Sequence, residues 1–356
     1  MSNNQIIKQN SDFIFGFEAI MTNPNGDPDQ ENKPRMDYET GTVLVSDARR
    51  KRDCRDFLKK KGFSIFVNTL EDNKVTMEEM FNHIIKAWLQ DKNKIDKLYD
   101  ESPNLSKAWL FNSDSTNYWD EYQKLKSNKK QKDIKKMFNN LFLTEIIKRE
   151  LIDIRLFGSA MAIDNVSKTY TGPVQINWGY SLHPVEMIKS NTITSIMNED
   201  NSTFGKKYKL YYALIAHHGS INKYNAMLTG MTEKDRDIFR KALIQGMAAN
   251  QTDSKQGQIP LFYIEIIYKE NFDGYLGDLR RFISVTYDKN KPIRSLSDLN
   301  IDFKKLADVI NEMKQRNYID KIIGWQYPFI EDGILKNLPE YEAVDLWALL
   351  EEITEG

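Results

Sequence analysis

The stretch DFIFGFEAIM, residues 12–21, is the first strand that the sequence predicts. Phe13, Phe15 and Phe17 occupy alternate positions in it, and a period of two is typical of a β-strand. Residues 260–268, PLFYIEIIY, form the most strand-like window of the chain. Further β-like runs lie at 151–163, 171–178, 209–216 and 283–287, and we expect the first two of these runs to be neighbouring strands.

Two helices accompany these strands. Ser46 can cap a helix that begins beside Asp47 and ends at Gly62. Thr232 and Asp235 form a capping box before a second helix with one apolar face. Without insertions, the order is strand, helix, strand, strand, helix, strand. This order predicts an α+β fold of the ferredoxin-like or RRM-like kind, a four-stranded antiparallel sheet with two helices on one face.

Other segments differ in composition from this sheet domain. Residues 65–149 contain three tryptophans and have helical periodicity, so we expect a helical insertion there. For residues 182–207 we expect a protruding hairpin or a flexible arm. The chain after residue 300 turns acidic. The sequence thus predicts a discontinuous sheet domain at 1–64 and 150–300, the insertion at 65–149, the arm at 182–207 within the sheet domain, and a mainly helical acidic segment at 301–356.

Composition excludes several classes of protein. The 356 residues carry 50 Lys and Arg against 51 Asp and Glu, so net charge gives no global sign of nucleic-acid binding. Cys54 is the single cysteine, which excludes an intramolecular disulfide and a Cys-rich metal site. The N-terminus lacks the pattern of a signal peptide, and no stretch of the sequence has the length and apolar character of a membrane span. We therefore expect a cytoplasmic protein without membrane contacts.

Local charge is more informative. The predicted helix reads SDARRKRDCRDFLKKKG and holds eight cations and two anions between residues 48 and 62. Lys51 and Arg55, and Arg55 and Lys59, are like-charge pairs four residues apart, which repel unless an anion lies against them. A polyanion would remove this cost, and phosphates bind such a helix without base identity. The alternative is a solvated helix face, which is also the simpler interpretation of the lysine-rich residues 124–136.

The sequence does not indicate an enzyme, a metal or a cofactor. Asp27 and Asp29 lie in the loop NPNGDPDQENKPR and could hold a metal, although turn formation explains the same residues. His217 and His218 end a predicted strand and could supply a general base for RNA cleavage. The common nucleotide-binding and hydrolase motifs are missing from the sequence.

Several blocks together resemble a known family. NPNGDPDQENKPRMDYETG, LVSDARRKRDCRDFL, DIRLFGSAMA, TGPVQI and HHGSINKYNAMLTGMTEKDRDIFRKAL follow one another between about residues 12 and 270. They resemble the backbone subunit of CRISPR Cascade complexes, the Cas7 family, with the Csh group of type I-B systems first and the type I-C group as near neighbour. The resemblance implies an RRM-like palm, a finger-like helical insertion and a thumb-like hairpin. It also implies a non-catalytic subunit whose copies polymerise along one guide RNA.

The resemblance further implies partners and site residues. The partners are CRISPR guide RNA, target DNA paired through the guide, copies of the chain, and Cascade subunits of the Cas5, Cas8 and Cas6 families. Lys51, Arg52 and Arg55 match the family's K-R-x-x-R pattern, and Ser46 matches its small polar residue at the start of the helix. We assign these four residues to guide phosphates. The other RNA-binding candidates are Arg35, Arg49, Arg155, Lys206 and Lys207, and candidate wedges between nucleotides are Met187, Ile188 and Ile193.

Two enzyme hypotheses stay open beside this one. The first is a metal-dependent ribonuclease of the type III backbone kind, which would use Asp27 or Asp29. The second is a ferredoxin-like endonuclease of repeat RNA with His217 or His218 as base. For the backbone subunit, we expect the acidic tail after Glu331 to lie away from the RNA.

Overall fold

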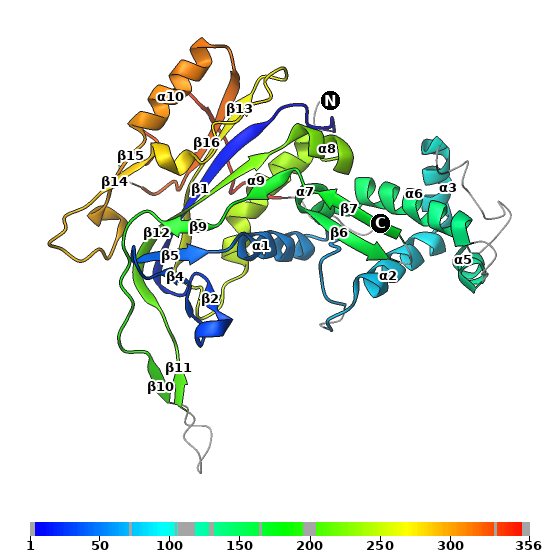
Figure 1. Ribbon diagram of the computed structural model, residues 1–356, viewed down its shortest axis with the longest axis horizontal. Helices are drawn as coiled ribbons and strands as arrows, with labels where there is room; N and C mark the ends of the chain where they lie inside the picture. The colour runs from blue at the N-terminus through cyan, green and yellow to red at the C-terminus, as the bar shows by residue number, and fades with distance from the viewer. Residues whose placement is uncertain are drawn as a thin grey trace.

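A large sheet runs through the centre of the molecule (Figure 1). The computed structural model describes residues 4–70, 73–103, 105, 118–127, 132–163, 166–194, 204–330 and 333–350. The strands follow the order β17-β16-β13-β1-β12-β9-β5-β4, and β8 also pairs with β12. Every pairing in this sheet is antiparallel except that of β16 with β17. The strands are β1 (Ser11–Thr22), β4 (Met36–Asp37), β5 (Thr42–Val45), β8 (Val174–Ile176), β9 (Gly179–Ser181), β12 (Leu210–Ile221), β13 (Gln258–Tyr268), β16 (Ile319–Gln326) and β17 (Glu342–Ala343).

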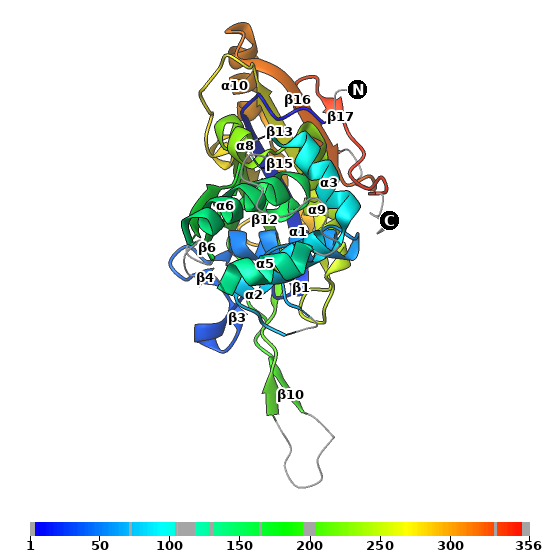
Figure 2. The same ribbon diagram turned by 90° about the vertical axis from the view of Figure 1, so that its right-hand side faces the viewer.

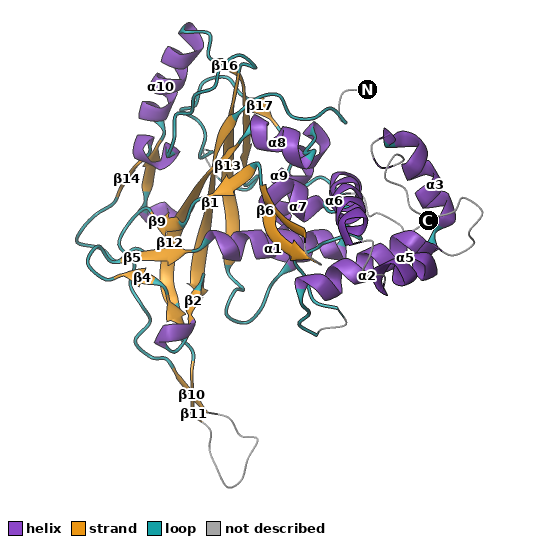
Figure 3. Ribbon diagram, turned by 45° about the vertical axis from the view of Figure 1, so that its right-hand side comes forward, coloured by secondary structure: helices purple, strands orange, loops and turns teal. Residues whose placement is uncertain are grey.

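The two faces of the sheet are covered by different helices (Figure 3). Phe13, Phe15 and Phe17 of β1 belong to the core that includes α1 (Asp47–Lys60) and α9 (Glu233–Ala249). Ile14 faces the opposite way, into the core beneath α10 (Lys304–Gln315) and the hairpin of β14 (Ser284–Thr286) and β15 (Asn300–Asp302). Because both faces are buried, β1 is apolar along most of its length.

A glycine allows α1 and α9 to approach closely. A Cβ atom on Gly246 of α9 would come within 2.8 Å of the backbone oxygen of Asp53 on α1. A side chain at this position would therefore push the two helices apart.

A helical lobe stands beside the sheet and has a hydrophobic core of its own (Figure 2). This core extends past residue 149, since it includes Leu151, Ile154 and Tyr170. A short helix, α8, lies between the lobe and the sheet domain. The elements here are α2 (Met77–Gln90), α3 (Lys92–Glu101), α5 (Tyr118–Ser127), α6 (Lys132–Arg149), α7 (Ile152–Phe157), β6 (Gly158–Ile163), β7 (Val166–Thr171) and α8 (Lys223–Thr229).

Two small hairpins lie at one end of the molecule. β2 (Gly26–Asp27) pairs with β3 (Lys33–Pro34) within the predicted loop, with a 3₁₀ turn at Pro28–Gln30 between them. β10 (Thr192–Thr194) pairs with β11 (Phe204–Lys206) in the predicted arm and projects away from the sheet (Figures 1 and 2).

The prediction of an α+β fold is confirmed, and the sheet is mostly antiparallel, but the prediction of four strands is wrong because the sheet has nine strands among the described residues. The prediction of a strand over 151–163 is wrong in its first half, where the chain forms α7. All six residues of α7 are buried. A short helix that is buried on every side has no polar face, so hydrophobic periodicity cannot distinguish its sequence from that of a buried strand. The two runs at 151–163 and 171–178 are also not neighbours, because β6 pairs with β7 and β8 pairs with β12.

The chain after residue 300 is not mainly helical in the part that the structure describes. Only α10 is an α-helix there, and it is followed by the strand β16. Four apolar side chains of β16, three isoleucines and one tryptophan, are buried. The backbone of β16 pairs with β13, which would otherwise be a strand with a free edge. Among the described residues, no helix has the length and apolar character needed to cross a membrane.

Candidate nucleic-acid interface

Hydrogen bonds join the N-terminus of α1 to the loop at 23–35 that precedes it in the chain. The Ser46 hydroxyl accepts a hydrogen bond from the Arg49 N–H (3.3 Å), so Ser46 caps the helix as predicted. The Ser46 N–H in turn donates to Asn25 Oδ1 (2.8 Å), and the Arg35 N–H donates to the Asn25 carbonyl (3.0 Å). The loop at 23–35 is thereby fixed against the start of α1.

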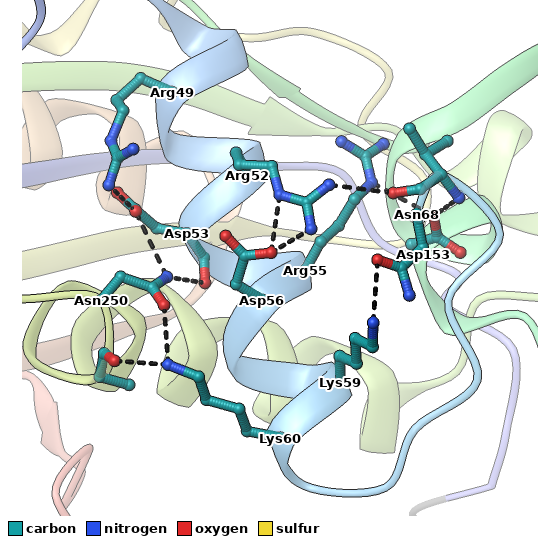
Figure 4. Close-up of polar contacts among 12 residues, drawn as sticks. Arg49, Arg52, Asp53, Arg55, Asp56, Lys59, Lys60, Asn68, Asp153 and Asn250 are labelled. Atoms are coloured by element: carbon teal, nitrogen blue, oxygen red, sulfur yellow. Dashed lines mark hydrogen bonds and ion pairs between the residues drawn. The ribbon is translucent and has the colours of Figure 1, made fainter. Parts of the chain in front are cut away.

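Carboxylates of the same helix lie against several of the α1 cations (Figure 4). Lys51 Nζ is 2.8 Å from Asp47, Arg49 pairs with Asp53, and Arg52 pairs with Asp56. Each of these pairs spans four residues of the helix. The chain itself therefore supplies anions that relieve the repulsion expected among the cations.

The pairs of Lys51 with Asp47 and of Arg52 with Asp56 are of a kind that another anion can replace, because both carboxylates are about 30% exposed. The Arg52 side chain is 39% exposed and its partner Asp56 is 31% exposed, so solvent screens their attraction. Exposed pairs four residues apart stabilise a helix by only about 0.3–0.5 kcal/mol. Replacement of such a carboxylate by an RNA phosphate therefore costs little free energy. Lys51 and Arg52 can thus bind the phosphates of an RNA backbone. Arg49 is 18% exposed but shares the buried Asp53 with Arg50 and Asn250.

Arg55 differs because its partner is buried. Asp153 is fully buried, accepts from Arg55 Nε (3.2 Å), and also accepts from the N–H groups of Phe66 (2.9 Å) and Val67 (3.0 Å). The Arg55 guanidinium lies over the Phe157 ring (5.1 Å). Loss of one partner of such a pair costs about 3–5 kcal/mol. Arg55 thus connects α1 with α7 and the entry to the lobe, and we leave it out of the phosphate site.

Arg155 is also engaged inside the protein. It is 8% exposed, and its guanidinium makes two bonds to the Asp235 carboxylate of α9 (2.8 and 3.0 Å). A third bond goes to the Ile147 carbonyl (3.3 Å). The assignment of Arg155 to guide phosphates is therefore withdrawn, because its donors already hold α7 against α9.

The other candidate cations surround the base of the arm. Lys206 lies 3.4 Å from Glu31 of the β2–β3 hairpin, and the Tyr208 hydroxyl donates to the same carboxylate (2.6 Å). These two contacts lower the pKa of Glu31. Lys207 lies 2.8 Å from Asp253. Both lysines are about half exposed, and each is paired with an exposed carboxylate that a phosphate could replace.

Arg35 is partly exposed and incompletely bonded. Its guanidinium lies 3.5 Å from Asp27 and over the ring of Trp178. Among the described residues, the buried Nε atoms of Arg35 and Arg49 have no hydrogen-bond partner. Buried donors without a partner are rare in native proteins, and they point to a ligand or water at this place.

Sequence analysis missed Lys255, which lies near the start of α1 in space. Burial lowers the pKa of Lys255 first, and the nearby charge of Arg49 lowers it further. Lys255 belongs to the turn before β13, about 200 positions away along the chain. Only a prediction that β13 pairs with β1 would have placed Lys255 next to α1.

The residues that were candidates for catalysis make contacts within the protein. Asp27 accepts the N–H of Asp29 (3.2 Å) and caps the 3₁₀ turn, in agreement with the turn interpretation. Among the described residues, no group of three or more His, Cys, Asp or Glu side chains is arranged so that it could hold a metal ion. His217 is fully buried and burial lowers its pKa to about 3, so the hypothesis of an RNA-cleaving base at His217 gains no support from its position. His218 lies 3.7 Å from the buried Asp12, and burial also lowers its pKa.

The proposed wedge residues lie beside the start of β12. Met187 forms an isolated bridge with Leu210, and the Ile188 N–H donates to the Lys209 carbonyl (2.9 Å). Both side chains are partly buried at the root of the arm. The side chain of Ile193 lies outside the described part of the chain.

Comparisons with known proteins agree on one family. The sequence model described as "CRISPR-associated protein Cas7" matches residues 9–304. The "CRISPR-associated protein Cas7" of Haloferax volcanii is 24% identical over 322 residues, which are 88% of this chain and 86% of that protein.

A solved structure shows a similar fold. A chain of a "CRISPR RNA-guided surveillance complex, pre-nicking" superposes with a TM-score of 0.54 at 14% identity, over 95% of this chain and 97% of that one. A chain of a "CRISPR RNA-guided surveillance complex" has a TM-score of 0.48 at 13% identity, over 94% and 96% of the two chains.

Proposed function

Because this chain belongs to the CRISPR-associated protein Cas7 family, we propose that it is a non-catalytic, RNA-binding backbone subunit of a type I surveillance complex. Its copies line up along one CRISPR guide RNA and support pairing of the guide with target DNA. The complex also contains subunits of the Cas5, Cas8 and Cas6 families. The type I-B group is the subtype that the sequence blocks favour.

The arrangement of strands supports a ferredoxin-like palm. The strands β13, β1, β12 and β9 are adjacent in this order, and α1 and α9 belong to the core on one face. In a ferredoxin-like unit, the strands lie side by side in the order 4-1-3-2. The strands β1, β9, β12 and β13 have this spatial order when they are numbered 1 to 4 along the chain. In this proposal, the helical lobe is the finger and the β10–β11 hairpin is the thumb.

One observation carries the proposal of RNA binding. At the start of α1, Lys51 and Arg52 are paired with partly exposed carboxylates of their own helix, and Arg52 also donates to the Val67 carbonyl (3.2 Å). Arg35 and Arg49 lie nearby, and each has a side chain that is partly exposed. Phosphates would pair with the accessible nitrogens of these cations and release counterions, with no need for base contacts. The proposed phosphate site therefore comprises Arg35, Ser46, Arg49, Lys51 and Arg52, with Lys206 and Lys207 at the arm base.

Salt dependence of RNA binding tests this site. The double variant Arg49→Ala with Arg52→Ala should weaken binding to unrelated RNA sequences about equally and reduce the salt slope by roughly one to two. Lys289→Ala with Lys291→Ala is the control, because it removes two exposed charges from the loop between β14 and β15. The proposal fails if the control lowers the slope as much, or if the loss is confined to one sequence.

Mass measurement tests the assembly. The chain purified together with its guide RNA should have a mass of several 41.7 kDa units plus the RNA. Treatment with ribonuclease should reduce it to smaller species. A single chain with no nucleic acid under both conditions would contradict the proposal.

A further inference from the structure

Trp178 is an exposed aromatic residue that none of the functions above uses. It lies between β8 and β9, and 43% of its surface is exposed. The pairing of β5 with β9 joins Leu44 to Tyr180 and Val45 to Gly179. The register ends at this pair, and Ser46 and Trp178 are the residues that follow it on the two strands. Trp178 therefore lies near the residue that caps α1.

The surroundings of the indole are cationic. The Arg35 guanidinium lies over the ring at 5.8 Å from its centre, and the buried Nε of Arg35 has no partner among the described residues. Arg49 lies in the first turn of α1, and its N–H donates to the Ser46 hydroxyl. An aromatic face and donors for phosphate thus lie next to each other, which is the arrangement that single-stranded nucleic acid requires.

The backbone that carries Trp178 is held in place from several sides. Its carbonyl accepts a bond from Arg280 Nη1 (2.7 Å), and its N–H donates to Asn177 Oδ1 (3.0 Å). Arg280 is buried, pairs with Asp278 (2.6 Å) and lies over the Tyr180 ring (4.0 Å). A rigid backbone lowers the entropy lost when the indole meets a ligand.

Gly179 adds to this rigidity. A Cβ atom at this position would come within 2.6 Å of the buried His217 ring. The strand after Trp178 is therefore packed tightly against β12, and the loop cannot move toward the core.

A contact with another protein is the alternative use of an exposed indole. Phe329 and Trp347 form a patch of that kind, because both side chains are exposed and their ring centres lie 6.2 Å apart. Trp178 differs, since the partner of its ring is an arginine. Its environment favours a base attached to a phosphate over an apolar protein surface.

We propose that Trp178 is a stacking platform for one base of the bound RNA, while Arg35 and the start of α1 hold the adjoining phosphate. The inference rests on the proposed RNA-binding function and adds a nucleobase subsite to it. Every base has a π-face, so this subsite tolerates any sequence, as a guide-binding subunit needs.

Two RNA probes separate stacking from phosphate binding. We would measure binding of the full chain to a mixed-sequence single-stranded RNA and to an abasic oligomer with the same ribose–phosphate backbone. Trp178→Ala should weaken binding of the normal RNA by about 5- to 100-fold, the range expected for one stacked base. Its affinity for the abasic oligomer and its salt slope should equal those of the wild type, because no charge is removed. Trp178→Phe should recover most of the loss.

The matched control is Trp347→Ala, whose indole is 44% exposed but lies among other rings in the C-terminal segment. It should bind both probes as the wild type does, with folding checked by circular dichroism. Equal loss on both probes, or no loss on either, would overturn the stacking subsite while the RNA-binding function stands. A Trp178→Ala variant that binds RNA normally but forms shorter assemblies would assign the indole to a protein contact instead. A wild type that binds neither probe refutes both proposals.

Discussion

Arginine side chains on α1 have different roles because their carboxylate partners differ in burial. Arg52 faces a partly exposed aspartate, whereas Arg55 faces an aspartate that is fully buried. Arg50 is 1% exposed and lies over the Phe17 ring (4.9 Å). A buried pair is costly to break and a solvated pair is not, so the same residue type serves the fold at one position and can serve a ligand at the next.

His217 gives a residue-scale prediction for pH. Burial, and then the charge of Arg50, lower its pKa to about 3 from the usual histidine value of 6.5. As the pH falls below 6.5, the unfolded chain binds a proton that the folded protein does not bind until about pH 3, so stability is lost on acidification. Between pH 6.5 and 5 the wild type should lose roughly 2 kcal/mol more than His217→Gln, measured by urea unfolding.

The comparison between variants isolates this histidine. Asp12 has the opposite effect, since burial raises its pKa to about 6 and its contribution falls as the pH rises from about 4. Asp12 is present in both proteins, so its effect cancels in the difference. His83→Gln, at an exposed position on α2, is the control and should follow the wild type. Parallel profiles of the wild type and His217→Gln would contradict the prediction.

At the scale of elements, α7 connects the lobe with the sheet domain. Ile154 of α7 lies in the core of the lobe, and Ile152 and Leu156 lie in the core between the sheet and α9. The pair of Arg155 with Asp235 ties the same short helix to the N-terminal capping box of α9. A helix of six residues is unstable alone, so these contacts hold it in place.

Removal of the Arg155 side chain should therefore destabilise the protein. Arg155→Ala leaves the buried Asp235 carboxylate without its cation, and we expect a loss of about 3–5 kcal/mol in the free energy of unfolding. The control is Arg149→Ala, which breaks more exposed pairs with Glu101 and Glu145 and should cost about 1 kcal/mol or less. Denaturant titrations of both variants check this. Equal losses would show that burial of Asp235 does not decide the cost.

At the scale of the whole molecule, the acidic C-terminal segment is packed against β16 and α9. The segment continues from β16 through β17, and Gln245 of α9 donates to the carbonyls of Leu346 (2.7 Å) and Ala348 (3.0 Å). Figure 2 shows β17 at the opposite end of the molecule from the β10–β11 hairpin. The placement away from RNA that the sequence suggested stays a prediction.

Charge neutralisation tests this placement. Glu340→Gln with Glu342→Gln should leave the affinity for a short RNA, long enough for one subunit, within about twofold of the wild type, because charges beyond a Debye length are screened. Both glutamates are exposed, so the double variant should also fold normally. A severalfold rise in affinity for the short RNA would place these carboxylates beside the bound RNA.

The sequence predicted much of the fold and part of the candidate site. Local signals were sufficient where an element carries its own pattern, as in the alternating phenylalanines of β1 and the capping box of α9. Ser46 was identified as the cap of α1 because the cap bond is made within a single turn. The cluster of cations on α1 was visible for the same reason, since all its members lie on one helix.

What the sequence alone determined was the presence of these elements and the positive charge near the start of α1. The tertiary structure decided which cations are free to act: Arg55 and Arg155 are bound to aspartates about 100 and 80 positions away. It also decided that α7 is a helix, that β16 extends the sheet, and that Trp178 lies near Ser46. The physical reason is that burial and pairing of charges depend on contacts between distant segments, and periodicity reports only on neighbours along the chain.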